Sequence, residues 1–192
     1  MTKPTSSHTS RSPEYALLGF LYEGPDHGYD LHQRLVTDLG QVWHVSQSQT
    51  YNILKRLEKE GDLAVNMAAQ KKVHDRQVLK ITPSGRKRFE AWLKTPTGSS
   101  VRAIRLEFIT RLYFIQKIAP ENLLSTLDAQ SAEINASLTR LEVNLAAIPA
   151  EQDFNRLSLR LRIQQLHSVL NWLAECRKAF DLNSNHSRRN SL

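Results

Sequence analysis

Apolar positions in the first half of the chain recur at helical spacing in three short segments. They run through residues 13–22, 29–39 and 46–61, and the glycine- and proline-containing stretch 23–28 separates the first two. Pro13 suits the first turn of a helix, because a helix leaves its first backbone N–H groups without internal partners. The pattern therefore predicts three short helices in succession.

The third segment divides most clearly into two faces. Ile53, Leu54 and Leu57 form its apolar stripe, and Ser46 with Gln49 has the spacing of an N-terminal capping box. The opposite side offers hydroxyl, amide and cationic groups: Ser48, Gln49, Asn52, Lys55, Arg56 and Lys59.

Two β-compatible runs follow this helix. Residues 63–69 and 77–82 are joined by the charged stretch 70–76, which predicts a hairpin. A two-stranded hairpin is marginally stable alone, so it must pack against helices. Thr82 then suits the N-cap of a further helix that reaches Leu93. Three helices and a hairpin with a charged tip have the order of a winged helix-turn-helix.

The second half is helical by pattern. Residues 104–118 form an apolar-rich segment, and two longer segments, beginning near Glu121 and before Leu159, repeat apolar residues at alternating spacings of 4 and 3. The two long helices could simply pair with each other as an antiparallel hairpin. Both also carry apolar residues off that seam, which a second chain would cover. The expected dimerisation residues are Leu159, Ile163, Leu166, Leu170 and Leu173.

The predicted fold class is mainly α, with an N-terminal winged helix-turn-helix of three helices plus a two-stranded wing, then a helical, coiled-coil-like dimerisation domain. The expected boundaries are a flexible tail at 1–12, the winged domain at 13–95, a linker at 96–103, the helical domain at 104–182 and a flexible tail at 183–192.

Composition narrows the functional classes. The chain has 192 residues, 26 Lys and Arg against 19 Asp and Glu, a net charge of +7, and one cysteine, Cys176. An intramolecular disulfide is therefore impossible, and a cytoplasmic location is expected. The sequence contains no apolar run of membrane-spanning length and no metal-binding or catalytic motif. We expect no enzymatic activity, cofactor or metal.

The predicted third helix has the chemistry that the DNA major groove recognises. Gln49 and Asn52 offer amides for adenine, Lys55 and Arg56 can reach guanine or phosphate, and hydroxyl groups near a helix N-terminus suit phosphate. The expected DNA-binding residues are Ser48, Gln49, Thr50, Asn52, Lys55 and Arg56, with Lys71, Lys72 and Arg76 at the wing tip. Most surface helices also have a polar outer face, so a protein-interaction adaptor that binds protein through its winged domain is the alternative.

Three stretches carry a family resemblance: "HGYDLHQRL", "QTYNILKRLEKEGDL" and "DRQVLKITPSGRKRFEAWL". They resemble the PadR family of transcriptional regulators, and "RLEFITRLYF" is similar to the opening of the helical C-terminal domain in its virulence-activator-like subfamily. The resemblance implies a homodimeric DNA-binding regulator, more commonly a repressor, with Tyr51 in the recognition helix and Arg76 in the wing. Where many members carry tyrosines in the second wing strand, this chain has Val78, Leu79 and Lys80.

The same resemblance implies two partners. A dimer would present its two recognition helices to grooves about 34–36 Å apart, or a multiple of that, on a near-palindromic operator of double-stranded DNA. A small aromatic effector near the domain junction is the second implied partner. Ordinary core packing is the alternative for the aromatic residues that could line such a site. These residues are Trp43, Trp92, Tyr113, Phe114 and Trp172.

Overall fold

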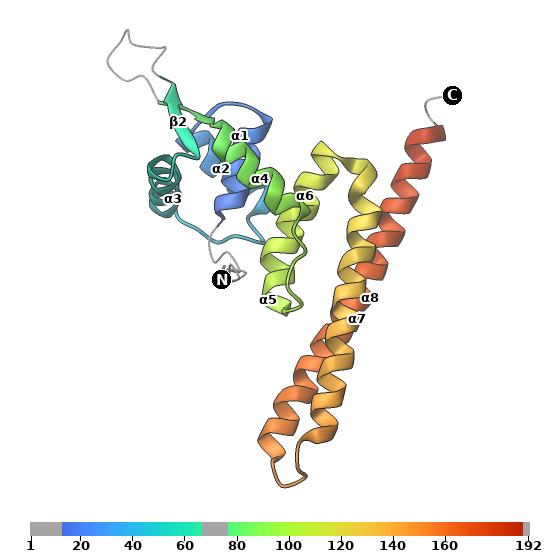
Figure 1. Ribbon diagram of the computed structural model, residues 1–192. Helices are drawn as coiled ribbons and strands as arrows, with labels where there is room; N and C mark the ends of the chain where they lie inside the picture. The colour runs from blue at the N-terminus through green and yellow to red at the C-terminus, as the bar shows by residue number, and fades with distance from the viewer. Residues whose placement is uncertain (1–12, 67–76, 190–192) are drawn as a thin grey trace, which may run out of the picture. The chain divides into compact units, whose positions relative to one another are not determined.

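The computed structural model describes residues 13–66 and 77–189, and side chains in these ranges except for Asn66 and residues 182–189. The predicted wing-tip contacts Lys71, Lys72 and Arg76 therefore lie outside the described residues. The chain separates into two compact units, whose α-helices are labelled in Figure 1. The first holds the chain up to Thr95 together with Ile109–Phe114, and the second holds Pro96–Phe108 and the chain from Ile115 onward.

Four helices build most of the first unit. They are α1 (Glu14–Glu23), α2 (Gly28–Leu39), α3 (Gln47–Lys59) and α4 (Pro83–Lys94). The three helices predicted from the apolar pattern are thus confirmed, and α4 begins as expected with Thr82 as N-cap, whose hydroxyl accepts a hydrogen bond from the Gly85 N–H.

A small antiparallel sheet accompanies these helices. It contains β1 (Asp26–His27), β2 (Leu63–Asn66) and β3 (Val78–Ile81) in the order β1-β3-β2. The two predicted wing strands are confirmed by β2 and β3. Strand β1 is an addition: two residues are too few to show the alternation by which a strand is recognised in a sequence.

Aromatic side chains fill the core of the first unit. Phe114, from the first part of α6 (Ile109–Ile118), meets Phe20 of α1 and Phe89 of α4 edge to face, with ring centroids 5.5 and 5.4 Å apart. A Cβ on Gly19 would lie 2.3 Å from the Phe114 ring, so only glycine permits this approach. Trp43 donates a 2.8 Å hydrogen bond from its indole N–H to the Thr110 hydroxyl. Trp43, Trp92 and Phe114 are buried as core residues.

The predicted helix at residues 104–118 is present but contains an irregularity. Helix α5 (Val101–Ala103) continues into a π-helical segment, η2 (Ile104–Phe108), and then into α6. A π segment places one extra residue in a turn, which shifts the faces of the helix on either side of it. The residues directly after this segment, Ile109–Phe114, belong to the first compact unit.

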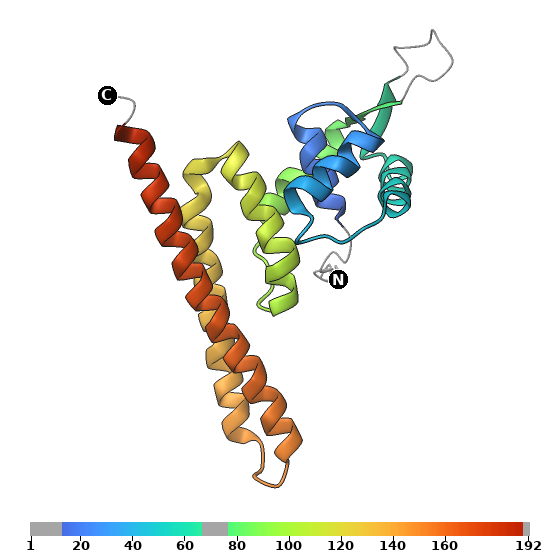
Figure 2. The same cartoon turned by 180° about the vertical axis from the view of Figure 1, so that it is seen from behind.

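A long antiparallel helical hairpin forms most of the second unit. The short 3-10 turn η3 (Pro120–Asn122) leads into α7 (Leu123–Ala147), and α8 (Asp153–Arg189) runs back beside it in both Figure 1 and Figure 2. Leu166 and Leu173 of α8 are buried, as are Leu127 and Ile134 of α7. The repeating apolar seam is therefore satisfied within one chain, as in the hairpin alternative.

The segment expected to be a linker packs against α7. Thr97 is 1% exposed, and its carbonyl accepts a 3.1 Å hydrogen bond from the Gln130 amide. The hydroxyls of Ser99 and Ser137 lie 2.8 Å apart. Gln130 and Ser137 are buried polar residues of α7, so their polar groups find partners in this segment.

None of the helices in the described part of the chain combines the length and the apolar character needed to cross a bilayer.

Candidate nucleic-acid interface

Helix α3 begins with the predicted capping box. The Ser46 hydroxyl accepts a 3.2 Å hydrogen bond from the Gln49 N–H, and the Gln49 side-chain oxygen accepts one of 2.8 Å from the Ser46 N–H. The two bonds satisfy backbone donors that the first helical turn would otherwise leave without partners. They also engage the amide oxygen of Gln49, which leaves its amide nitrogen for any external contact.

The exposed side of α3 carries a continuous polar stripe. Ser48, Asn52, Lys55 and Lys59 are all exposed and follow one another at spacings of four, three and four residues. At about 100° of rotation per residue, their Cα atoms fall within about 60° of the helix circumference. Among the described residues, no hydrogen bond or ion pair engages the side chains of Ser48, Asn52 or Lys55. We call these four residues the α3 stripe.

Thr50, which the sequence places among the DNA-binding residues, lies on the opposite side of α3. Its side chain is 0% exposed, and its hydroxyl lies 3.0 Å from Nδ1 of His32 on α2. The same hydroxyl donates to the Ser46 carbonyl at 3.3 Å. Thr50 therefore fixes the N-terminal half of α3 to α2, and it offers no surface to an external partner.

Tyr51 lies beside the stripe and packs on α2. It is 38% exposed, and a Cβ on Gly28 would stand 2.8 Å from its ring, so the absence of a side chain at Gly28 lets the ring lie against the start of α2. A shallow pocket of about 250 Å³ opens here. Its lining residues are His27, Gly28, Tyr29, Tyr51, Leu54, Lys55, Glu58, Gln77 and Leu79.

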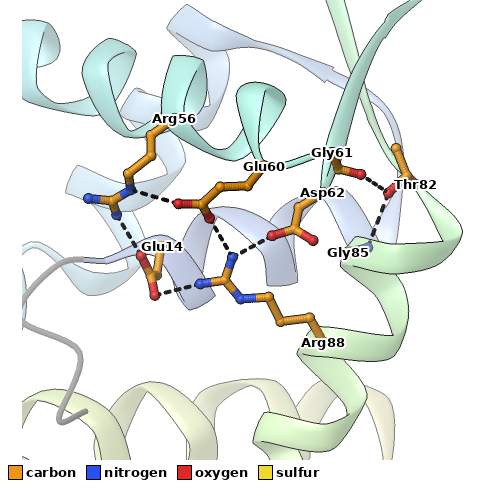
Figure 3. A network of polar contacts seen from close by, with 8 residues as sticks. All are labelled: Glu14, Arg56, Glu60, Gly61, Asp62, Thr82, Gly85 and Arg88. Atoms are coloured by element: carbon orange, nitrogen blue, oxygen red, sulfur yellow. Dashed lines mark hydrogen bonds and ion pairs between the residues drawn. The ribbon is translucent and has the colours of Figure 1, made fainter.

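Arg56 lies on the other flank of α3 and takes part in an ion-pair network, shown in Figure 3. Its guanidinium group is 2.5 Å from a carboxylate oxygen of Glu14 and 3.8 Å from one of Glu60. Arg88 of α4 contacts Glu14 at 2.9 Å, Glu60 at 2.8 Å, and Asp62. Burial alone would lower the pKa of Arg88, but Tyr15 and these carboxylates stabilise its charge and raise that pKa above its usual value.

The turn after α3 is held by the start of α4. Gly61 has a φ of 79°, which an L side chain rarely adopts, and its carbonyl accepts a 2.7 Å hydrogen bond from the Thr82 hydroxyl. The same hydroxyl accepts from the Gly85 N–H at 3.1 Å (Figure 3). One threonine thus joins the end of α3, the end of β3 and the start of α4.

Strand β3 presents one cation to solvent. Leu79 and Ile81 are buried, whereas Lys80 is exposed. In this stretch, where the resemblance leads to the expectation of tyrosines, the exposed side chain is a lysine.

Sequence reasoning found the polar residues of α3 but not the groups that hold the helix in place. Glu14 and Arg88 are 42 and 32 residues from Arg56 in the sequence, and His32 is 18 residues from Thr50. No local spacing rule connects such positions. Within the described residues, no cluster of three or more His, Cys, Asp or Glu side chains could hold a metal ion.

These features define a winged helix-turn-helix protein with an exposed polar stripe on its third helix and a helical C-terminal unit. Residues 17–91 match the model of the transcriptional regulator PadR-like family, and residues 104–181 match that of the virulence activator alpha C-terminal domain. The chain thus carries a domain of the PadR-like family of transcriptional regulators, which are not enzymes, followed by a C-terminal domain of the virulence activator alpha type.

The individual relatives are less than 30% identical in sequence to this chain. The negative transcriptional regulator PadR of Bacillus subtilis (strain 168) is 29% identical over 131 residues, which are 67% of this chain and 70% of that protein. The crystal structure of Bacillus subtilis PadR in complex with operator DNA is 26% identical and matches 87% of this chain and 98% of that chain, with a TM-score of 0.41. Its complex with p-coumaric acid is 25% identical and matches 88% and 98%, with a TM-score of 0.40.

Proposed function

We propose that the protein is a repressor that binds a near-palindromic operator as a homodimer, with the α3 stripe in the major groove. The observation that carries this proposal is the stripe itself. A hydroxyl, an amide and two lysines follow one another on the exposed side of a helix whose N-terminal half is bonded to α2 and whose C-terminal half is ion-paired to α1 and α4. Repression is favoured by the relative named a negative transcriptional regulator.

The proposed roles follow from the chemistry of each side chain. Asn52 can form paired hydrogen bonds with adenine, and Ser48 can bind a base edge or a phosphate. Lys55 and Lys59 supply cations for the backbone. Gln49 contributes its amide nitrogen and Tyr51 its exposed edge. Lys71, Lys72 and Arg76 keep the wing contacts predicted from the sequence, whereas the buried Thr50 has no direct role.

The C-terminal unit supplies a surface for a second copy. Of the expected dimerisation residues, Leu166 and Leu173 are buried within the chain, and Leu159, Ile163 and Leu170 are half-buried. Near the hairpin turn, α8 instead exposes Phe154 (87%), Leu157 (58%) and Leu161 (56%). Their spacing of three and four residues places them on one side of the helix. We propose that this apolar tip, together with the half-buried seam residues, meets the same surface of the partner.

A mobility-shift titration tests DNA binding. The full-length protein is added to the DNA upstream of its own gene and to a shuffled fragment of equal length, at several salt concentrations. We expect saturable retardation of the upstream DNA that weakens steeply with salt, and Lys55→Gln should weaken it. Lys178→Gln, which removes an exposed cation from α8, is the matched control and should change nothing. Equal binding of both fragments would refute sequence-specific recognition, and no binding at low salt would refute the proposal and favour the protein-binding adaptor.

Two further parts of the proposal come from the single cysteine and from the resemblance, respectively. The protein is expected to act in the cytoplasm, and a small aromatic effector is expected to weaken operator binding. Adding phenolic acids to the titration above tests the second point. A set of small aromatic acids that leaves the retardation unchanged would contradict it.

A further inference from the structure

Two arginines and three carboxylates join the elements around the C-terminal end of α3. Glu14 is the first residue of α1, Arg56 and Glu60 lie at the end of α3, Asp62 follows the Gly61 turn, and Arg88 projects from α4 (Figure 3). The two guanidinium groups share both Glu14 and Glu60. The network therefore connects α1, α3 and α4 through charge-assisted contacts, which are stronger than neutral hydrogen bonds.

Glu14 is the centre of this arrangement. Its side chain is 14% exposed, and its two oxygens face different partners: one is 2.5 Å from Arg56 and the other is 2.9 Å from Arg88. Adjacent residues of a helix point about 100° apart. Lys55 therefore projects with the α3 stripe, whereas Arg56 is turned to the flank where Glu14 receives its guanidinium group.

We infer that Arg56 is a positioning residue for DNA recognition rather than a phosphate contact, and that Glu14 is the group through which it acts. The inference rests on the proposed function. Residues that read DNA must be held within roughly 0.5 Å and 10–20° of their working geometry. The Thr50–His32 contact fixes one half of α3, and the Arg56–Glu14–Arg88 contacts fix the other half.

The opposite assignment makes a different prediction for Glu14. Arg56 has a side chain that is 47% exposed, so a cation there could also turn toward a phosphate. If it did so, replacing Glu14 by Gln would free the guanidinium group and remove a negative charge, and DNA would bind as tightly as before or more tightly. If Arg56 positions α3, the same replacement loosens the helix and DNA binds more weakly. The two assignments thus predict effects of opposite sign.

The test measures operator binding by fluorescence anisotropy across a series of salt concentrations, with the full-length protein. We expect Glu14→Gln and Arg56→Gln each to weaken binding by about five- to tenfold, and the double variant to be no weaker than either, because the residues act as one unit. The slope of log affinity against log salt should stay at the wild-type value. Lys55→Gln should instead reduce that slope by about 0.9, the value of one phosphate contact.

Arg56→Lys provides a second, independent variant. Lysine keeps the charge that a phosphate contact needs, but it lacks the planar fork that can pair with Glu14 and Glu60 together. We expect weakened binding at an unchanged salt slope. Glu133→Gln, which removes a carboxylate 3.6 Å from Arg140 on α7, is the matched control and should bind as the wild type does.

Two results would overturn the inference: undiminished or tighter binding by Glu14→Gln, or a slope lowered by about 0.9 in Arg56→Gln with near-normal binding by Arg56→Lys. Circular dichroism at the assay temperature identifies any variant that is unfolded, and Arg56→Lys then decides the question if Glu14→Gln is lost. A wild-type protein that shows no preference for its operator would contradict the proposed function itself, which is a distinct outcome.

Discussion

At the scale of single residues, Asn52 and Lys55 are neighbours in the α3 stripe but offer DNA different chemistry. An amide discriminates among bases, whereas an ammonium group attracts any phosphate. We expect Asn52→Ala to remove about 1–3 kcal/mol of discrimination between the operator and a site mutated at one position. Lys55→Gln should weaken all sequences about equally. Competition binding with single-base operator variants measures both effects.

The outcome that contradicts this division of roles is simple to recognise. If Asn52→Ala lowers affinity for every sequence by the same factor, Asn52 contacts only the backbone. Gln41→Ala, at an exposed amide in the turn after α2, is the control for loss of an amide away from the stripe.

Gly85 makes a second prediction at this scale. A Cβ there would lie 2.2 Å from the backbone oxygen of Asp62, at the place where α4 meets the turn after α3. Since backbone cannot yield as a side chain can, Gly85→Ala should lower the free energy of unfolding by about 1–3 kcal/mol, the usual range for overpacking. Gly98→Ala is the control, because no atom lies within 4 Å of its added Cβ. Urea unfolding measures both, and equal midpoints would contradict this close approach.

Whether the sequence predicts the environment of a single side chain depends on how near its partners lie in the sequence. The exposure of Ser48, Asn52 and Lys55 follows from helical phase and was predictable. The engagement of Thr50 by His32 and of Arg56 by Glu14 depends on side chains from other helices. Helical phase alone cannot show that Arg56, unlike its neighbour Lys55, forms an ion pair with another helix.

At the scale of elements, the start of α3 separates stability from recognition. Ser46 caps the helix, whereas Ser48, two residues further on, is exposed. We expect Ser46→Ala to cost about 1 kcal/mol of unfolding free energy because it leaves a backbone donor without its partner. Ser48→Ala should leave stability within about 0.5 kcal/mol of the wild type but weaken operator binding. Urea unfolding measures stability and fluorescence anisotropy measures operator binding. A comparable loss of stability in both variants would contradict this separation of roles.

The elements that were predicted correctly have local signals. The caps at Ser46 and Thr82 and the apolar stripe of α3 are read within a few residues of one another. Strand β1 exists only because β3 pairs with it, and the π segment at Ile104–Phe108 interrupts a sequence that reads as one regular helix. Both depend on packing that a short stretch of sequence does not encode.

At the scale of the whole molecule, the apolar tip of α8 makes the sharpest prediction. We expect Leu157→Asp combined with Leu161→Asp to convert a dimer into monomers without unfolding the hairpin, because both side chains are exposed within the chain. Leu166→Asp should unfold the hairpin instead, since Leu166 is 0% exposed. Light scattering gives the mass and circular dichroism the helical content.

Ala174→Asp, at another exposed position of α8, is the control and should leave the mass unchanged. An unaltered dimer mass in the double variant would place the contact between copies elsewhere on the chain.

The sequence could not distinguish the two uses of an apolar seam. The repeating leucines of α7 and α8 would suit either a partner helix in the same chain or one in a second chain. Apolar side chains pack between those of the facing helix in the same way in both cases. The burial of Leu127 and Ile134 with Leu166 and Leu173 resolves this in favour of the hairpin. Phe154, Leu157 and Leu161 are among the apolar residues that the described part of the chain leaves exposed, and we propose that they, with the half-buried seam residues, serve for association.

The exposed Phe154 also bears on how a cell would set the amount of this regulator. If two copies must meet through that tip before the operator is held, occupancy in dilute conditions grows with the square of the monomer concentration rather than in proportion to it. The number of gene copies would then affect regulation strongly, because halving the concentration of the protein would lower operator occupancy by more than twofold.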